Sequence, residues 1–351
     1  MRSRIETRIA ALMLGCFMLT ACDTEAARKK VSAAPAAKKD TVVAAPPAAA
    51  PEPPPPPTLD TATYNALTLH MVHDSASAKW PVKTGYPLPG ALLPFHRIVA
   101  YYGNFYSTRM GILGEIEPES MLKKLQGEVA KWQEADSSVK VIPALHYIVV
   151  SAQGQPGKAG MYRLRMPFTQ IDKTLELAAK INAIVFLDIQ VGLSTLQKEI
   201  PELERYLALP NVHLAVDPEF SMKTGKVPGS VIGTFDAADL NYASEYLAEL
   251  VKKNDLPPKI LVVHRFTKGM VTNYKNIALR PEVQIVMDMD GWGFPAKKVN
   301  SYKLAVSSEP VQFTGFKLFY KNDIKTPPWN TIMSPKDVLK LYPKPMYIQY
   351  Q

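Results

Sequence analysis

Short runs of apolar and β-branched residues alternate with amphipathic segments from residue 97 to the end of the chain. Each run is almost continuously apolar, as buried parallel strands are, and lacks the polar and apolar alternation of a half-exposed antiparallel strand. The pattern predicts eight strands, at residues 97–102, 140–149, 183–189, 212–216, 230–235, 259–264, 284–289 and 313–319.

Helical patterns fill the gaps between these strands, at residues 118–135, 170–181, 195–208 and 239–254 and, more weakly, at 272–278 and 296–306. Pro118 suits a first helical position, and Thr169 and Ser194 resemble the first residues of capping boxes. Eight strands interleaved with helices predict an α/β fold, a (β/α)8 TIM-type barrel. A doubly wound open sheet is the alternative, but no GxGxxG follows the first strand. Residues 63–92 and 334–351 belong to none of these predicted strands and helices, and we expect them to be decorations packed on the barrel.

The N-terminus has the organisation of an export signal. Arginines precede an apolar stretch, residues 9–19, that is shorter than the roughly 20 residues needed to span a bilayer. The run Leu19-Thr20-Ala21-Cys22 resembles the lipobox of bacterial lipoproteins, and an ordinary secretory signal is the alternative. The resemblance implies that residues 1–21 are a signal peptide and that acylated Cys22 anchors the protein to the lipid bilayer. The expected location is the cell membrane or the outer membrane, facing the periplasm or the exterior.

Residues 22–58 consist mainly of Ala, Pro and Lys and end in five consecutive prolines. This composition predicts a disordered, extended linker, with residues 59–351 as the barrel domain. The formal charge of +9 suits an anionic envelope surface. No dense Lys/Arg stripe is interleaved with aromatic residues, so nucleic-acid binding is not expected. The only cysteines are Cys16 and Cys22, which leaves the folded part without a thiol for disulfides, catalysis or metal binding. The oligomeric state stays open.

Polar residues follow nearly every predicted strand. In barrel enzymes the active site lies at the carboxyl ends of the strands, and charged side chains are costly to bury there unpaired. The sequence therefore predicts a site built from these strand ends, which carry Tyr101, Tyr102, His146, Asp188, Gln190, Asp217, Glu219, Asp236, His264, Arg265, Asp288, Asp290 and Lys317.

Asp217 and Glu219 are two residues apart and so share a face of a strand. The pair resembles the arrangement in barrel glycoside hydrolases, including chitinase-like and phage-lysozyme-like families, in which the glutamate is the general acid. The resemblance implies Glu219 as the acid, with Asp217 and Asp188 setting its pKa and Asp290 activating water or substrate. The longer Asp-x-x-Asp-x-Asp-x-Glu run is absent. The alternative is that Asp217 caps a turn and Glu219 is solvated.

Further residues are candidates for binding substrate. Trp292 lies between two glycines and can stack on a sugar ring, as can Tyr102. His264 and Lys317 would orient the acids, with His146 and Glu115 as neighbours. The two histidines with carboxylates could also hold a metal ion. Because His-x-His and His-Glu-x-x-His spacings are absent, we expect no metal and no other cofactor.

The segments YYGNFYSTRMGILGE, VFLDIQVG, AVDPEF, ILVVHRFT, MDMDGWG and GFKLFY resemble a family of exported bacterial proteins with a barrel-like region, distantly similar to glycoside hydrolases. The hypothesis is an envelope lipoprotein that hydrolyses a carbohydrate or glycopeptide, such as a peptidoglycan-type ligand. A non-catalytic carbohydrate- or wall-binding lipoprotein is the alternative, and a metal-dependent hydrolase is the second.

Overall fold

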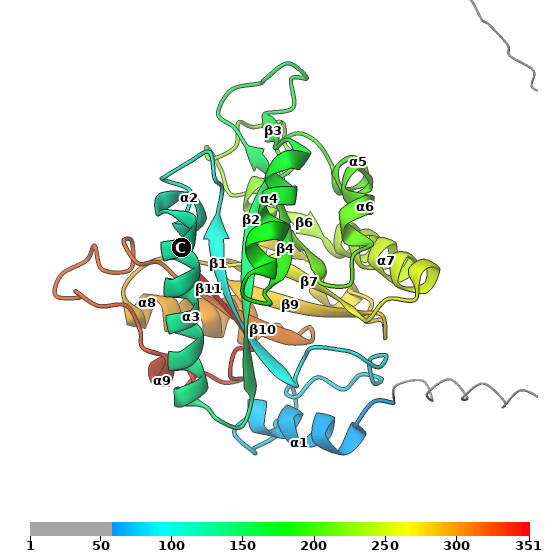
Figure 1. Cartoon of the computed structure of the whole chain (residues 1–351), viewed down its shortest axis with the longest axis vertical. Helices are drawn as coiled ribbons and strands as arrows, with labels where there is room; N and C mark the ends of the chain where they lie inside the picture. Colours follow the sequence, from blue (N-terminus) through cyan, green and yellow to red (C-terminus); the bar gives the residue numbers. More distant parts are fainter. Residues whose placement is uncertain (1–57) are drawn as a thin grey trace, which may run out of the picture. The chain divides into compact units, whose positions relative to one another are not determined.

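Eight parallel strands close into a barrel in the computed structural model, which describes residues 58–351 (Figure 1). These strands are β1 (His96–Gly103), β2 (Lys140–Ala152), β4 (Ile184–Ile189), β5 (Val212–Val216), β7 (Lys259–His264), β9 (Val283–Met289), β10 (Phe313–Leu318) and β11 (Tyr347–Tyr350). They are hydrogen-bonded in the order β1-β11-β10-β9-β7-β5-β4-β2, and β1 pairs with β2 to close the ring. The predicted (β/α)8 barrel is confirmed.

Helices connect most of the barrel strands and cover their outer side. They are α1 (Thr61–Met71), α2 (Ile112–Glu115), α3 (Pro118–Ala135), α4 (Phe168–Ala179), α5 (Leu196–Glu199), α6 (Glu204–Leu207), α7 (Ala237–Asn254), α8 (Pro295–Ser301), which continues into a π-helical turn over Tyr302–Ser307, and α9 (Pro335–Val338). Figure 1 shows α3 and α4 lying along β1, β2 and β4, in agreement with their contacts. Pro118 is the first residue of α3, as predicted.

Seven of the eight predicted strands are barrel strands, but the prediction at residues 230–235 is wrong. Only Phe235 and Asp236 form a short strand, β6 (Phe235–Asp236), which pairs with β8 (Val271–Thr272) outside the barrel. Val231 and Ile232 are β-branched, yet both are exposed, so no packing surface holds them in a sheet. The eighth barrel strand is β11, in the tail that we expected to be a decoration. This strand was not predicted because it is short and follows several prolines.

Three local predictions also differ from the structure. The helix expected at residues 272–278 is the end of β8 followed by a 3-10 turn, Tyr274–Asn276. No side-chain cap begins α4 or α5, and the Ser194 hydroxyl instead donates to the Glu199 carboxylate at 2.5 Å. The pairing of β8 with β6 replaces the start of the expected helix, and the contact with Glu199 takes the Ser194 hydroxyl away from a capping position.

The two faces of each barrel strand have different roles because neighbouring side chains alternate in direction. Outward residues such as Leu187, Val216 and Ile348 pack against the helices in one large hydrophobic cluster. Inward residues near the amino ends of the strands, such as Phe186 and Val262, form a second apolar cluster. The inward positions near the carboxyl ends are polar, and these positions form the candidate site.

The amino-terminal end of the barrel is covered by α1 and the segment after it, which lie at the bottom of Figure 1, below the start of β1. Val72, Trp80 and Leu93 from this segment belong to the inner apolar cluster. The expectation that residues 63–92 pack on the barrel is confirmed. This cover leaves the carboxyl ends of the strands as the place where a ligand can enter the barrel.

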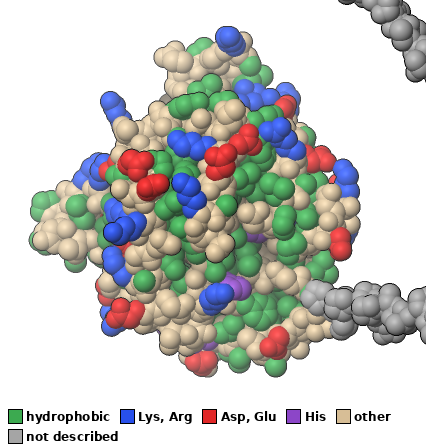
Figure 2. All heavy atoms as spheres, in the orientation of Figure 1, with side chains coloured by type: hydrophobic (Ala, Val, Ile, Leu, Met, Phe, Trp, Pro, Cys, Tyr) green, Lys and Arg blue, Asp and Glu red, His purple; other side chains and the backbone are tan. Residues whose placement is uncertain are grey.

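The signal peptide, Cys22 and all but the last residue of the expected linker lie outside the described residues. Within residues 58–351, no helix is long and apolar enough to cross a membrane. On the face shown in Figure 2, Lys and Arg side chains are interspersed with Asp and Glu, so this face carries no broad patch of one charge.

Because β11 closes the barrel, we predict that two isoleucine-to-alanine substitutions differ greatly in their effect on the free energy of unfolding. Ile348 in β11 is fully buried, whereas Ile232, in the segment wrongly predicted as a strand, is 51% exposed. We expect Ile348→Ala to lower the free energy of unfolding by about 2–5 kcal/mol because it leaves a cavity. Ile232→Ala should change it by no more than about 0.5 kcal/mol. Urea denaturation measures both, and equal losses would contradict the assignment of β11.

Candidate functional site

A cavity of about 670 Å³ opens at the carboxyl ends of the barrel strands. Seven residues that sequence analysis assigned to the site line it: Tyr102, Gln190, Asp217, Glu219, Asp290, Trp292 and Lys317. Arg109, Phe266 and Phe319 are also part of the wall. The cavity therefore combines three carboxyl groups with aromatic rings, as the sequence predicted.

A capped turn places Glu219 in this cavity. Asp217 directly follows β5, and its Oδ1 accepts a hydrogen bond from the Glu219 backbone N–H at 3.0 Å, at the start of the 3-10 turn Pro218–Phe220. The backbone N–H of Gly233 donates to the Glu219 carbonyl at 2.7 Å. A Cβ on Gly233 would lie within 2.7 Å of three carbonyl oxygens of this turn, so glycine allows the close approach. Asp217 caps the turn, and the turn directs Glu219 into the cavity.

Burial favours the protonated forms of the cavity acids. It raises the pKa of the Asp217 carboxyl well above its usual range, and the nearby charges of Asp290 and Asp188 add to the effect. Burial together with the charge of Asp290 also raises the pKa of Glu219, and burial raises that of Asp290. Glu219 is half-buried and lines the cavity, so it can carry a proton where a ligand can reach it.

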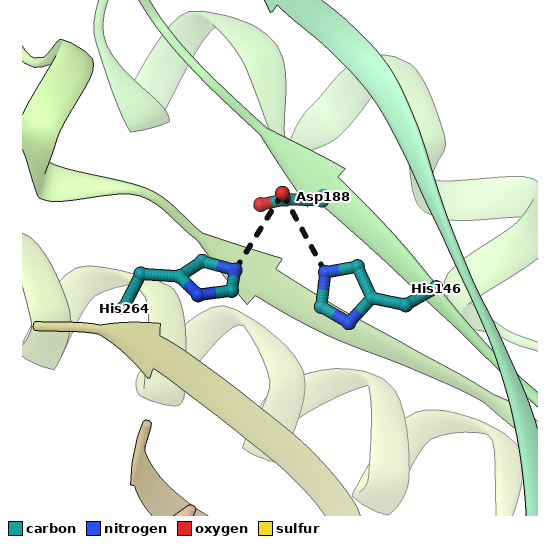
Figure 3. A group of neighbouring side chains, drawn as sticks. All are labelled: His146, Asp188 and His264. Carbon is teal, nitrogen blue, oxygen red and sulfur yellow. Dashed lines mark ion pairs between the residues drawn. The ribbon is translucent and has the colours of Figure 1, made fainter. Parts of the chain in front are cut away.

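Three fully buried side chains lie together inside the barrel and do not line the cavity: His146 from β2, Asp188 from β4 and His264 from β7. Figure 3 shows both imidazole rings directed toward the Asp188 carboxylate. The Nε2 atoms of His146 and His264 lie 3.5 and 3.6 Å from Asp188 Oδ2. We call these three residues the His-Asp-His cluster.

The charges of the cluster are unequal. Burial acts to raise the pKa of Asp188, but the charge of His264 and the nearby His146 ring lower it, so Asp188 is an anion. Burial acts to lower the pKa of His264, but Asp188 raises it well above its usual value. Burial lowers the pKa of His146 to about 4. Without a ligand, His264 is the charged histidine and His146 is neutral at pH 7.

The other ring nitrogen of each histidine faces side-chain oxygen atoms. His146 Nδ1 lies 2.6 Å from the Tyr347 hydroxyl, which accepts a hydrogen bond from Gln349 Nε2 at 2.9 Å. His264 Nδ1 lies 3.3 Å from Asp288 Oδ2 and 3.5 Å from Asp290 Oδ2. The Tyr347 hydroxyl on β11 thus fixes the His146 ring, whereas His264 faces the carboxylates of Asp288 and Asp290 without a hydrogen bond to either.

A glycine makes room for this arrangement on β10. A Cβ on Gly315 would come within 2.5 Å of Asp288 Oδ1 and 3.0 Å of the Tyr347 ring. Gly315 is paired with both of these residues across the neighbouring strands. Its missing side chain lets Asp288 lie beside His264 in the barrel interior.

Tyr102 separates the His-Asp-His cluster from the cavity. Its ring centroid lies 5.2 Å from that of His146 and 6.0 Å from that of His264. The Lys317 ammonium lies 3.7 Å from the Tyr102 ring centroid on the cavity side. Gln190 Nε2 donates to the Tyr102 hydroxyl at 3.3 Å and to Asp217 Oδ2 at 3.4 Å. The floor of the cavity is thus a connected polar layer above the cluster.

The Trp292 loop is held by a buried ion pair. Lys298 Nζ lies 2.8 Å from Asp323 Oδ2 and donates to the Gly291 carbonyl at 3.1 Å. Asp323 Oδ1 accepts from the Gly293 backbone N–H at 2.9 Å. Trp292 itself is 50% exposed at the cavity. An exposed indole on a fixed loop is suited to stacking on a ligand.

The structure separates the predicted site residues into two groups. Glu219, Asp217, Asp290, Trp292, Tyr102 and Lys317 surround the cavity, whereas Asp188, His146 and His264 lie below it. Glu115 belongs to neither group, because it is paired with Lys321 at 2.8 Å beside a smaller neighbouring cavity. The expectation that Glu115 is a neighbour of the two histidines is not supported by its position.

Sequence analysis missed Tyr347, Gln349, Lys298 and Asp323. The first two were missed because β11 was placed outside the barrel. Lys298 reads as an ordinary lysine of a helix and is 1% exposed only because the tertiary structure buries it. Asp323 follows β10 by several residues and carries no local signal.

The raised pKa of Asp217 predicts a pH-dependent stability. The folded protein binds this proton more tightly than the unfolded chain, so the stabilisation is present at low pH and lost as the pH rises through the folded-state pKa. Asp217→Asn cannot lose a proton. We expect this variant to raise the free energy of unfolding at pH 7 by about 1 kcal/mol or more. The decline of that free energy above about pH 4 should also become flatter than in the wild type. Asp172→Asn at the surface is the control; a wild-type slope in Asp217→Asn would contradict the prediction.

Comparison with known proteins yields no match, either to a known protein family or to a characterised protein. The resemblance to exported bacterial proteins therefore stays a prediction, and the function must be argued from the cavity and its surroundings.

Proposed function

We propose that this protein is a glycoside hydrolase-like enzyme that acts on a carbohydrate or glycopeptide. The observation that carries the proposal is the position of Glu219, a half-buried carboxyl group with a raised pKa, in the same cavity as Asp217, Asp290 and Trp292. Hydrolysis of a glycosidic bond needs a protonated acid for the leaving oxygen and a second carboxylate for the opposite face of the sugar. The cavity supplies both kinds of group.

In this proposal Glu219 is the general acid and donates its proton to the glycosidic oxygen. Asp290, on the strand-end loop after β9, is the second carboxylate and in its ionised form activates water or attacks the anomeric carbon. Burial raises its pKa, but the nearby charges of His264 and Lys317 favour the ionised form. Asp217 positions Glu219 through the capped turn. Asp188 lies below the floor as an anion and contributes negative charge under the positively charged transition state.

Charge pairing supports an enzyme over a carbohydrate-binding protein. Acids used only for binding would be neutralised by basic side chains. Among the described residues, neither Lys317 nor Arg109 forms an ion pair with a cavity carboxylate, and Arg265 pairs with Glu309 instead. Of Asp217, Glu219 and Asp290, only Asp290 has a cationic partner, His264 Nδ1 at 3.5 Å. The side chains of Glu219 and Asp217 therefore keep the capacity to exchange protons.

The proposed substrate class follows from the cavity and from the predicted export. Trp292 and the aromatic rings of the wall suit the apolar face of a pyranose ring. The lipobox-like run predicts an anchor at Cys22 and places the domain in the envelope, where peptidoglycan-type glycans are available. The proposed enzyme is thus a tethered hydrolase of envelope carbohydrate.

The first test removes the proposed acid. Glu219→Gln cannot donate a proton, so we expect kcat for hydrolysis of muropeptides or oligosaccharides to fall by about 10²–10⁴-fold while binding measured by calorimetry is retained. Glu202→Gln is the matched control, since Glu202 is at the surface and paired with Arg165. Unchanged turnover in Glu219→Gln would refute the assignment. Wild-type binding without cleavage would favour the binding-protein alternative.

The second test concerns the exposed tryptophan. Trp292→Ala should weaken oligosaccharide binding by roughly two- to tenfold, as expected for the loss of about 0.5–1.5 kcal/mol of stacking, with little change in thermal stability. Trp329→Ala is the control, because Trp329 is 41% exposed but stacks on Phe294 and lines a different cavity. Calorimetric titration measures both variants, and equal Kd values in Trp292→Ala and wild type would exclude a stacking role.

A further inference from the structure

We propose that the His-Asp-His cluster is a binding site for one divalent transition-metal ion of the zinc class, held by Nε2 of His146, Oδ2 of Asp188 and Nε2 of His264. This inference shares Asp188 with the proposed hydrolase, but neither Glu219 nor Asp290 is among the ligands. The three ligand atoms come from three different barrel strands and lie within 4.8 Å of one another. That spacing fits a common ion about 2.0–2.2 Å from each atom after a small adjustment.

The distances inside the cluster fit an ion better than direct or water-mediated hydrogen bonds. The separations of 3.5 and 3.6 Å from Asp188 Oδ2 to the two Nε2 atoms exceed the 2.7–3.2 Å of N–H···O hydrogen bonds. A bridging water with two bonds of about 2.8 Å each would hold the outer atoms roughly 4.5 Å apart. Ligands around a tetrahedral zinc ion are separated by roughly 3.3 Å.

The cluster contains an unusual concentration of buried polar atoms without partners. Among the described residues, Nε2 of both histidines and both carboxylate oxygens of Asp188 form no hydrogen bond, although all three side chains are fully buried. Each such atom costs about 1–3 kcal/mol if it stays unpaired. Both Nε2 atoms face Asp188 Oδ2 (Figure 3), so a single cation can bind these three atoms.

The surroundings of the two rings have the form of an outer ligand shell. A histidine that binds a metal through one nitrogen usually donates the other N–H to an oxygen. His146 Nδ1 has the Tyr347 hydroxyl at 2.6 Å, and His264 Nδ1 faces Asp288 and Asp290. Both Nε2 atoms are thereby left to point at Asp188.

The donor set and the local charge select the kind of ion. Two imidazoles and one carboxylate suit zinc and its neighbours in the first transition series, whereas Mg²⁺ and Ca²⁺ prefer sites made of oxygen alone. Five acidic side chains gather in or just below the cavity, at Asp188, Asp217, Glu219, Asp288 and Asp290, and two lysines, Lys297 and Lys317, also line it. A divalent cation would offset part of this negative charge.

Tyr102 lies over the cluster on the cavity side, so the ion would be shielded from solvent. We therefore assign it a structural and electrostatic role in joining β2, β4 and β7 beneath the cavity floor. A consequence is that metal binding should raise the melting temperature of the protein.

The experiment is reconstitution of the full-length protein after treatment with a chelator. We expect uptake of about one equivalent of Zn²⁺ or Co²⁺ by mass spectrometry of metal content, with visible Co²⁺ absorption bands and a higher Tm. Asp188→Asn and His146→Gln should bind each ion at least tenfold more weakly. His213→Gln is the matched control, because His213 is equally buried on β5, and Phe186 packs against it as it packs against His146.

Two results would overturn the proposal. The first is folded wild-type protein that takes up less than a tenth of an equivalent of Zn²⁺, Co²⁺ and Mn²⁺. The second is wild-type affinity in the ligand variants. If those variants fail to fold, X-ray absorption spectroscopy of the zinc-loaded wild type is the test. Scattering from two imidazoles would support the site, and its absence would overturn the proposal. If Glu219→Gln still binds the ion, metal binding does not depend on the proposed catalytic acid. The metal proposal can then be judged separately from the hydrolase proposal.

Discussion

The closed ring of strands is the constraint on which the rest of this structure depends. Closure requires β11 to pair with both β1 and β10, and it turns one face of every strand toward the barrel axis. Inward residues far apart in the sequence, such as His146 and Tyr347, are brought into contact in the interior. Without β11 the ring would be open, and Tyr347 would not be available to fix the ring of His146.

The side chains in the barrel interior differ in polarity between its amino-terminal and carboxyl-terminal halves. Its amino-terminal half is filled by Phe186, Val262 and other apolar side chains and is covered by the segment after α1. Its carboxyl-terminal half holds ionisable groups that would be costly to bury singly. Their pairing across strands, as between His264 and Asp288, allows this half to hold ionisable groups, while the other half is filled by apolar packing.

Much of this arrangement could be predicted from the sequence. Glu219, Asp217 and Trp292 were assigned to one site because they follow strands whose carboxyl ends meet in a barrel, and they do line one cavity. The depth of each residue could not be predicted. Asp188 and Asp217 both follow apolar runs, yet Asp188 lies below the cavity floor, because depth depends on the stagger between neighbouring strands and not on local sequence.

The sequence by itself determined the barrel class, the alternation of strands and helices, and the chemical types of the strand-end residues, because these follow from local periodicity and composition. Only the tertiary structure decided that β11 and not residues 230–235 completes the ring, that His146, Asp188 and His264 converge on one point, and that Lys298 holds the Trp292 loop. The physical reason is that these features depend on strand pairing, register and burial between residues distant in the chain, which no local pattern encodes.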